Sequence, residues 1–343
     1  MGEVFAGRYE LVDVLDSGGV GTVWRAWDHR EAVYLAAKVL RQSDGESLLR
    51  FVRETSHRID HPHVVTPLGW VGEDDRVLFT MPLVRGGSLA ALLGDFGRLP
   101  IGWAVELLRQ LLTALQAVHE VGLVHRDVKP GNLLLHATGP DRPQLLLSDF
   151  GAAAQVAAPR LTRSDSVIGT PGYFAPEQVR GADPDPLQDV YAAAVVTLQT
   201  LTGEAPTAAG DLPAYQPRTA LEHAVAALLG EMAAEDPRRR PQGARPARDR
   251  LDAIHGSHDL GTGAEAASPV EVFDHVPSLP EGWTDEGPRS GATAPAPAPT
   301  ATSAAEEPVG PAGPKAGSRV PPAAWVLAVL GVVLLVVAVL LEL

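Results

Sequence analysis

The chain has 343 residues, of which 45% are hydrophobic and 20% charged, which indicates a globular protein of about two domains. Its formal net charge of −14 argues against a nucleic-acid-binding surface, because such surfaces are basic. It contains no cysteine, which excludes disulfides and thiolate metal sites.

Two strands joined by a glycine-containing turn are predicted near the N-terminus. Residues 9–15 alternate in polarity as a strand does, the turn over 16–21 contains Gly18, Gly19 and Gly21, and the strand pattern resumes over 22–27. Because glycine has no Cβ, the backbone amides of such a turn can approach phosphate oxygens closely. The turn alone is a weak indication of a phosphate site.

Three further elements are predicted before residue 90. A strand over 35–38 ends at Lys38, an amphipathic helix covers 48–59 and includes Glu54, and an apolar strand covers 77–84. Taken by itself, a lysine at the end of a strand is most often a surface residue.

Three histidines within seven residues, His57, His61 and His63, raise the alternative of a metal site. Zinc sites usually have four ligands at defined spacings, whereas Pro62 interrupts this run and no cysteine lies nearby. A metal site is therefore the less favoured interpretation of these histidines.

The segment 125–132 places five polar side chains between a predicted helix over 104–119 and a short apolar strand over 133–135. Buried charges are kept only when they are paired or bound, so this loop indicates a site rather than packing. Asp127 can accept a proton or orient a hydroxyl, Lys129 can neutralise a developing anion, and Asn132 offers an oxygen to a hard cation. These are the groups that phosphoryl transfer requires.

A second apolar strand, over 145–147, is followed by Asp149-Phe150-Gly151, seventeen residues after Asn132. A polar stretch over 160–166 then leads to the segment 169–177, which ends in Ala175-Pro176-Glu177. Beyond it, Asp189 opens a predicted apolar helix over 190–201.

The composition changes at residue 255. Gly, Pro, Ala, Ser and Thr dominate over 255–322, which predicts a disordered acidic linker because such a segment buries little apolar surface. Residues 323–341 are nineteen residues without a charge. A helix of that length spans about 28 Å, close to the roughly 30 Å hydrocarbon core of a bilayer, so a transmembrane helix is predicted.

The charges flanking residues 323–341 predict the topology. Lys315 and Arg319 precede this helix, whereas only Glu342 and Leu343 follow it. The positive-inside rule then predicts a single-pass protein of the cell membrane, with the folded part in the cytoplasm.

Taken together, these motifs resemble those of the protein kinases. Segment 125–132 is similar to the catalytic loop H-R-D-L-x-x-x-N, with Val128 in place of Leu, and the D-F-G and A-P-E triplets follow in order. Lys129 and Thr170 resemble the serine/threonine branch. On this resemblance, residues 9–254 are identified as a bacterial (Hanks-type) serine/threonine kinase domain. The implied fold is α+β and two-lobed, with a β-rich N-lobe and a helical C-lobe.

The resemblance implies catalytic and metal-binding roles. Asp127 would accept or orient the substrate hydroxyl, Lys38 and Lys129 would steady phosphates, and Glu54 would pair with Lys38. Magnesium, for which manganese could substitute, would be held by Asn132 and Asp149. The implied ATP-binding residues are Gly18, Gly21, Val23, Ala36, Lys38, Met81, Pro82, Val84 and Leu134, and Pro82 can offer only its carbonyl because it has no N–H.

The resemblance also implies regulation and structural pairs. Arg126 would bind a phosphate on the activation loop, for which Thr162 and Ser164 are the candidate acceptors. Glu177 would pair with Arg240, and Asp189 would tie its helix to the catalytic loop backbone. The implied partners are proteins phosphorylated on Ser or Thr, this chain included, and a kinase dimer is compatible with the resemblance.

One departure from the pattern keeps alternatives open. Asp16 stands where the first glycine of G-x-G-x-x-G belongs, and a carboxylate facing the phosphates would weaken nucleotide binding. A pseudokinase or nucleotide-binding scaffold is therefore the main alternative. A small-molecule phosphotransferase of similar fold fits less well, because it would not need the A-P-E segment.

Overall fold

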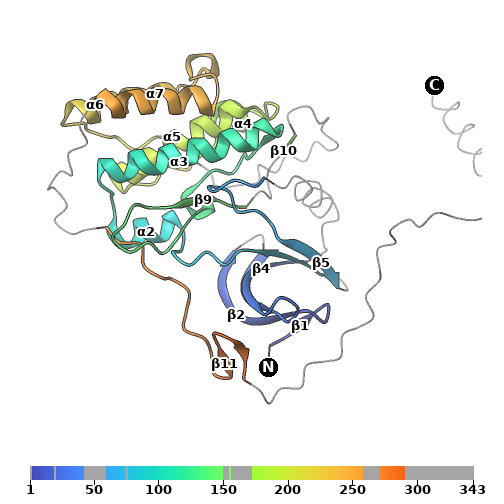
Figure 1. Ribbon diagram of the computed structural model, residues 1–343. Coiled ribbons are helices and arrows are strands. Elements are labelled where there is room, and N and C mark those ends of the chain that lie inside the picture. The colour runs from blue at the N-terminus through green and yellow to red at the C-terminus, as the bar shows by residue number, and fades with distance from the viewer. Residues whose placement is uncertain are drawn as a thin grey trace, which may run out of the picture. The chain divides into compact units, whose positions relative to one another are not determined.

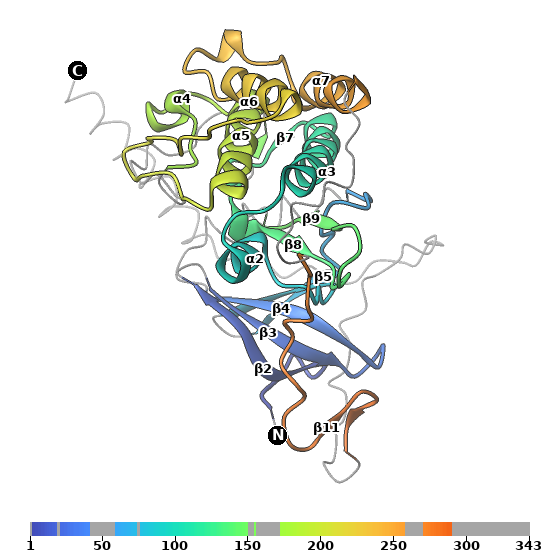
Figure 2. The ribbon, with the colours of Figure 1, turned by 90° about the vertical axis from the view of Figure 1, so that its left-hand side faces the viewer.

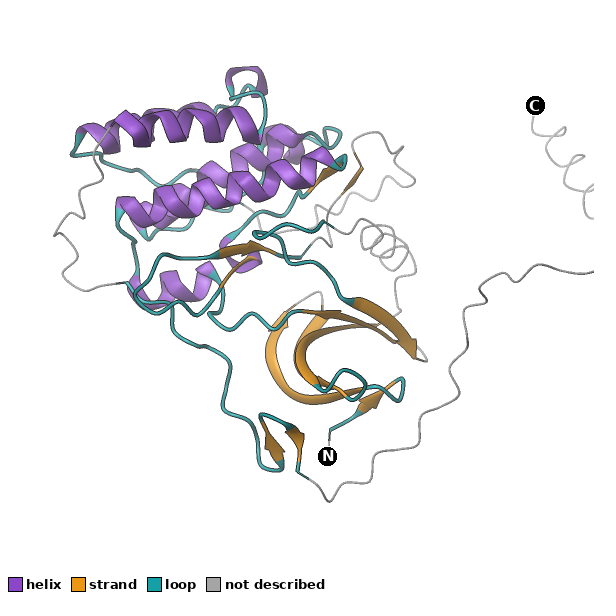
Figure 3. Ribbon diagram, in the orientation of Figure 1, coloured by secondary structure: helices purple, strands orange, loops and turns teal. Residues whose placement is uncertain are grey.

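The computed structural model describes residues 2–18, 21–41, 59–73, 76–149, 154–155, 172–257 and 270–289. All of them belong to one compact unit, Met1–Ala298. Within it the strands of a large sheet gather at one end and the helices at the other (Figures 1 and 3). The two-lobed α+β arrangement expected from the sequence is therefore present.

The N-lobe is a six-stranded antiparallel sheet with strand order β1-β2-β3-β4-β6-β5. Successive side chains of a strand point to opposite faces, and in β4 Ala37 enters the buried cluster of the lobe while Ala36 and Lys38 face the other way. The strands are β1 Val4–Phe5, β2 Tyr9–Gly18, β3 Gly21–Asp28, β4 Val33–Arg41, β5 Gly69–Glu73 and β6 Arg76–Met81.

The C-lobe is built around helix α3, whose buried face packs against α5 and α7. Its predicted limits of 104–119 extend to Ile101–Glu120. Helix α5 begins at Pro186, earlier than predicted, because Asp185 caps it and proline fits the first helical position. The helices are α2 Leu89–Phe96, α3, α4 Pro176–Val179, α5 Pro186–Thr202, α6 Ala220–Met232 and α7 Ala244–Ser257, with short 3₁₀ turns η1 Pro130–Asn132 and η3 Pro237–Arg239.

Two small antiparallel pairs lie next to the C-lobe helices. Strand β8 Leu133–Leu135 pairs with β9 Leu145–Leu147, and β7 Leu123–Val124 pairs with β10 Ala154–Gln155. The limits of β8 and β9 are those predicted from the sequence. Strand β6, in contrast, ends at Met81 instead of Val84, and the predicted helix over 48–59 lies outside the described residues except for Ile59.

The prediction of a disordered linker over 255–322 is wrong for two parts of that range. Residues 255–257 continue α7, and residues 270–289 are packed and end in a hairpin of β11 Trp283–Thr284 and β12 Gly287–Pro288. Residues 270–289 are ordered because a few apolar residues within this polar segment are buried. Val270 and Val272, for example, enter the C-lobe core. In Figure 2 this segment, in orange, runs from near α2 and β8 past the sheet.

No helix within the described ranges is long and apolar enough to cross a membrane. The predicted membrane segment 323–341 lies outside those ranges.

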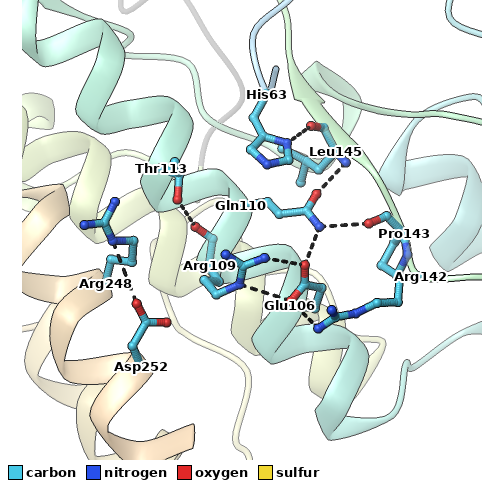
Figure 4. Close-up of polar contacts among 10 residues, drawn as sticks. All are labelled: His63, Glu106, Arg109, Gln110, Thr113, Arg142, Pro143, Leu145, Arg248 and Asp252. Carbon is cyan, nitrogen blue, oxygen red and sulfur yellow. Dashed lines mark hydrogen bonds and ion pairs between the residues drawn. The ribbon is translucent and has the colours of Figure 1, made fainter. Parts of the chain in front are cut away.

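The buried side chain of Gln110 joins helix α3 to strand β9 through hydrogen bonds (Figure 4). Gln110 accepts a hydrogen bond from the Leu145 amide at 2.7 Å and donates to the Pro143 carbonyl at 2.8 Å and to Glu106 at 2.6 Å. On the other side, His63 Nδ1 lies 2.9 Å from the Leu145 carbonyl. Strand β9, which leads to Asp149, is thereby fixed on α3.

Glu106 remains ionised within this group. Burial raises the pKa of its carboxyl, but hydrogen bonds from Arg109 and Gln110, together with the charges of Arg109 and Arg142, hold that pKa below its ordinary value. Arg142 also pairs with this carboxylate, with its Nη2 lying 3.3 Å from Glu106 Oε2.

Replacing Gln110 by leucine keeps the volume of the side chain and removes all three hydrogen bonds. Because the amide of Leu145 and the carbonyl of Pro143 would then be buried without partners, we expect the free energy of unfolding to fall by roughly 2–4 kcal/mol. Urea denaturation measures this. The matched control is Gln116→Leu on the same helix, where the glutamine is half-buried; an equal loss in both variants would contradict the assignment.

Candidate active site

A cavity of about 640 Å³ lies between the sheet and the C-lobe. The strand register brings its N-lobe wall together, since Val23 pairs with Lys38 and Ala36 pairs with Met81. Seven of the nine residues predicted to bind nucleotide line it: Val23, Ala36, Lys38, Met81, Pro82, Val84 and Leu134.

The other two predicted residues, Gly18 and Gly21, pair with each other where β2 and β3 meet. Gly21 has a φ of +151°, and a Cβ there would lie 2.8 Å from the Val39 carbonyl oxygen. The fold therefore requires glycine at this position for packing within the sheet.

The segment between β6 and α2, which connects the lobes, is hydrogen-bonded to β8. The amide of Gly86 donates to the Leu135 carbonyl at 2.9 Å, and the amide of Leu135 donates to the Gly87 carbonyl at 2.9 Å. These bonds hold Leu134 in the wall of the cavity, opposite the strands of the N-lobe.

Asp127 is oriented by two donors from its own loop. Lys129 Nζ lies 2.8 Å from Asp127 Oδ2, and Asn132 Nδ2 donates to the same oxygen at 2.9 Å and to the Asp127 carbonyl at 2.7 Å. Among the described residues, hydrogen bonds to this carboxylate end on Oδ2, so Oδ1 is the oxygen available to a substrate. Since Asn132 donates with its nitrogen, its Oδ1 is the atom available to a cation.

The backbone of this loop is held by Asp189, as predicted. The carboxylate of Asp189 accepts from the amides of His125 and Arg126 and from His119 Nε2, each at 2.8 Å. Burial raises the pKa of Asp189, but the hydrogen bond and charge of His119 and the Arg126 amide outweigh it and lower the pKa below its ordinary value. Arg126 adopts a left-handed φ of +67°, a strained conformation that these bonds stabilise.

Asp149 lies two residues after β9 and faces Lys38. Lys38 Nζ is 2.8 Å from each carboxylate oxygen of Asp149, although 111 positions separate the two residues. Asp149 also has a left-handed φ, +64°. The site thus brings together the lysine predicted to bind phosphates and the aspartate predicted to bind metal.

The loop over 125–132 and the Asp149 segment are joined through Ser148. Both the amide and the hydroxyl of Ser148 donate to the Asn132 carbonyl, at 2.9 and 3.0 Å, and His125 Nε2 lies 3.0 Å from the Ser148 carbonyl. His125 is fully buried. The role of His125 here is structural, because it fixes the position of Asp149 relative to Asp127.

The cavity wall offers oxygen atoms that suit a divalent cation bound to a phosphorylated ligand. Within the described ranges no group of three or more His, Asp or Glu side chains could hold a metal ion alone. Magnesium bound to a nucleotide needs only one or two protein oxygens, because phosphates and water complete its shell. Asn132 and Asp149 both line the cavity and provide such oxygens.

Asp16 lies at the rim of the cavity and is exposed. Its Oδ1 accepts a hydrogen bond from the Ser17 amide at 2.8 Å. Solvent screens a charge in this position, so we expect it to weaken nucleotide binding without abolishing it.

Two further contacts support the loop over 125–132. Arg240 forms the predicted pair with Glu177, at 2.6 and 2.9 Å. The next residue, Gln178, donates to the Arg126 carbonyl at 3.0 Å. Gln178 was not predicted from the sequence. Its place directly after the A-P-E triplet is the feature that could have pointed to it.

Other predicted site residues lie outside the described residues: Glu54, Phe150, Gly151, Thr162, Ser164 and Thr170. Conversely, His275 and Val276 line the cavity and were not predicted, because the composition around them is that of a linker.

Comparison with known proteins agrees with this geometry. A sequence model described as the protein kinase domain matches residues 9–247. Serine/threonine-protein kinase PknA of Mycobacterium tuberculosis is 39% identical over 218 residues, covering 61% of this chain and 50% of that protein. Serine/threonine-protein kinase PkaB of Streptomyces coelicolor is 39% identical over 219 residues, covering 61% and 52%. The chain thus spans about half the length of these relatives.

Replacing Asp189 by asparagine removes the buried charge at nearly constant volume. We expect the free energy of unfolding at pH 7 to fall by roughly 3 kcal/mol, because an amide cannot accept all three hydrogen bonds. Denaturation of both proteins across pH measures this.

The pH dependence follows from the lowered pKa of Asp189. Its contribution to stability is fully present above the unfolded-state pKa of about 3.9 and is lost as the pH falls through the folded-state pKa. The difference between wild type and variant should therefore be constant above about pH 5 and shrink below about pH 4. A difference that grows in acid would contradict the assignment.

Proposed function

Because the chain belongs to the protein kinase family, we propose that it is an ATP-dependent serine/threonine kinase, which transfers the γ-phosphate of ATP to protein hydroxyls, its own included. The observation that carries this proposal is the arrangement of Asp127. Lys129 and Asn132 both bind its Oδ2 and thereby direct the other oxygen to an incoming hydroxyl. Both relatives named above are serine/threonine-protein kinases, which supports the choice of Ser/Thr.

In the proposed reaction Asp127 Oδ1 accepts the hydrogen bond of the substrate hydroxyl and takes up its proton as the new O–P bond forms. The bond between the γ-phosphorus and the β,γ-bridging oxygen of ATP breaks at the same time, and ADP leaves with the electron pair. Lys129, bonded to the other oxygen, would stabilise negative charge on the transferring phosphoryl group. Positioning and charge neutralisation supply the rate, because phosphoryl transfer asks little covalent chemistry of the protein.

The nucleotide is proposed to lie in the cavity with its phosphates toward Lys38 and its base against the segment 82–84. Asn132 and Asp149 would hold Mg²⁺, which when bound neutralises charge on the phosphates. Lys38 is only 10% exposed at its side chain, so it acts on a phosphate with little screening by water.

A pseudokinase or nucleotide-binding scaffold remains the alternative, and the observation that favours it is Asp16 at the rim of the cavity. The complete set of Lys38, Asp127, Asn132 and Asp149 favours catalysis instead, since a scaffold would need none of the contacts that orient Asp127.

We further propose that residues 323–341 anchor the protein in the cell membrane, with the kinase domain in the cytoplasm. The support is the uncharged stretch of nineteen residues and the two basic residues before it, Lys315 and Arg319.

We also propose regulation by phosphorylation of Thr162 or Ser164. Arg160 and Arg163 lie beside them in the sequence, and Arg126, next to the catalytic aspartate, is the proposed cation for the phosphate. A phosphate adds three acceptor oxygens and about −1.5 to −2 charges, enough to order a loop.

Replacing Asp127 by asparagine should lower the rate of phosphoryl transfer roughly 10²–10⁴-fold, because the variant cannot take up the proton. Binding of ATP should stay near the wild-type value, since the proposed nucleotide contacts lie elsewhere. Transfer of γ-labelled phosphate and calorimetric ATP binding measure the two. Asp141→Asn, at an exposed aspartate of the loop between β8 and β9, is the control; undiminished transfer by Asp127→Asn would refute the role.

Deleting residues 323–343 should move the protein from the membrane to the soluble fraction and leave its activity intact, because the catalytic residues lie before residue 255. Fractionation of cells followed by a kinase assay measures both. A deletion product that still sediments with membranes would rule out the proposed anchor.

A further inference from the structure

Residues 270–289, here named the clasp, lie beyond the region matched by the kinase sequence model, which ends at residue 247. They nevertheless contact the C-lobe, the segment between the lobes, and the N-lobe in succession. The clasp runs along the molecule as the orange segment of Figure 2.

The first part of the clasp is anchored in the C-lobe. Val270 and Val272 are 6% and 1% exposed and belong to the C-lobe core. Val272 exchanges two backbone hydrogen bonds with Gly139, at 2.8 and 3.0 Å. The ring of Phe273 stacks on Phe96 of α2.

The last part of the clasp is anchored on the N-lobe. Arg25, buried in β3 and paired with Asp13, donates to the carbonyls of Pro277 at 2.9 Å and Ser278 at 3.3 Å. The hydroxyl of Tyr34 donates to the Thr284 carbonyl at 2.6 Å. Gly287 lies so close to Trp27 that a Cβ there would be 2.5 Å from the indole ring.

The middle of the clasp is held at the edge of the cavity. The His275 amide donates to the Arg85 carbonyl at 2.7 Å, and Asp274 forms an ion pair with Arg85 at 2.7 Å. The His275 ring packs on Gly87, where a Cβ would lie 3.1 Å from it. Here His275 and Val276 become part of the cavity wall.

We propose that the clasp completes the nucleotide site, with His275 and Val276 contacting the nucleoside of ATP. This inference rests on the proposed function, which places ATP in the cavity. The two residues are fixed to Arg85 and Gly87, next to the backbone that would face the base, whereas Lys38 and Asp149 mark the phosphate end. His275 can exchange hydrogen bonds with a hydroxyl or a base edge, and Val276 offers apolar contact.

The affinity for nucleotide then depends on residues outside the catalytic domain proper. Because both ends of the clasp are anchored independently, His275 and Val276 are positioned before the nucleotide binds. Pre-positioned groups lose little conformational freedom on binding, and that raises affinity.

The test uses the full chain and MgADP as the probe. The double variant His275→Ala/Val276→Ala should raise the Kd for MgADP about 5–10-fold in calorimetry, as expected when two pocket contacts are lost. The control Glu281→Ala/Glu286→Ala changes two exposed clasp residues outside the cavity wall and should leave Kd unchanged. Thermal unfolding followed by circular dichroism verifies that both variants are folded.

A second measurement avoids substitution. In the wild-type protein, MgADP should slow hydrogen exchange of the backbone amides over 274–276, since the nucleoside would cover this part of the clasp. Equal Kd values for wild type and the double variant, or an equal loss in the control variant, would overturn the inference while leaving the proposed function intact. Failure of the wild-type chain to bind MgADP would overturn both.

Discussion

The geometry of the site depends on the hydrogen bonds that the buried carboxylate of Asp189 accepts. It accepts three hydrogen bonds, two from the backbone of the catalytic loop and one from His119, and the loop turns at Arg126 through a left-handed conformation. A strained backbone persists only where its surroundings determine it. An ionised group inside the protein is costly unless fully bonded, so the position of the loop and the charge of Asp189 are stabilised together.

Other polar side chains around the site also hold backbone segments in position through hydrogen bonds. Arg240 and Glu177 fix the segment that contacts Arg126 through Gln178, and Gln110 fixes β9 and therefore Asp149. Each of these side chains acts on backbone position, and none needs to touch a substrate. Lys38 is placed by strand β4 of the N-lobe. Asp127, Asn132 and Asp149 lie on two loops of the C-lobe, which His125 and Ser148 join.

The features predicted from the sequence were those with a local signal. Apolar runs gave β8 and β9 at their observed limits, and the polar loop between apolar elements gave Asp127, Lys129 and Asn132. The role of Gln110 could not be predicted, because it depends on where β9 lies against α3. The clasp was missed because its ordering rests on a few residues, such as Val272 and Trp283, in a composition that averages to a linker. Its partners, Arg25 and Arg85, are some 190 to 250 positions away.

We propose that this arrangement of residues transfers phosphate to protein hydroxyls. The most direct measurement is incubation of the purified chain with γ-labelled ATP, Mg²⁺ and a generic protein substrate, followed by identification of the labelled residues. We expect magnesium-dependent label on serine or threonine of the substrate and of the chain itself. Nucleotide binding without any protein-bound label would contradict it and would favour a scaffold.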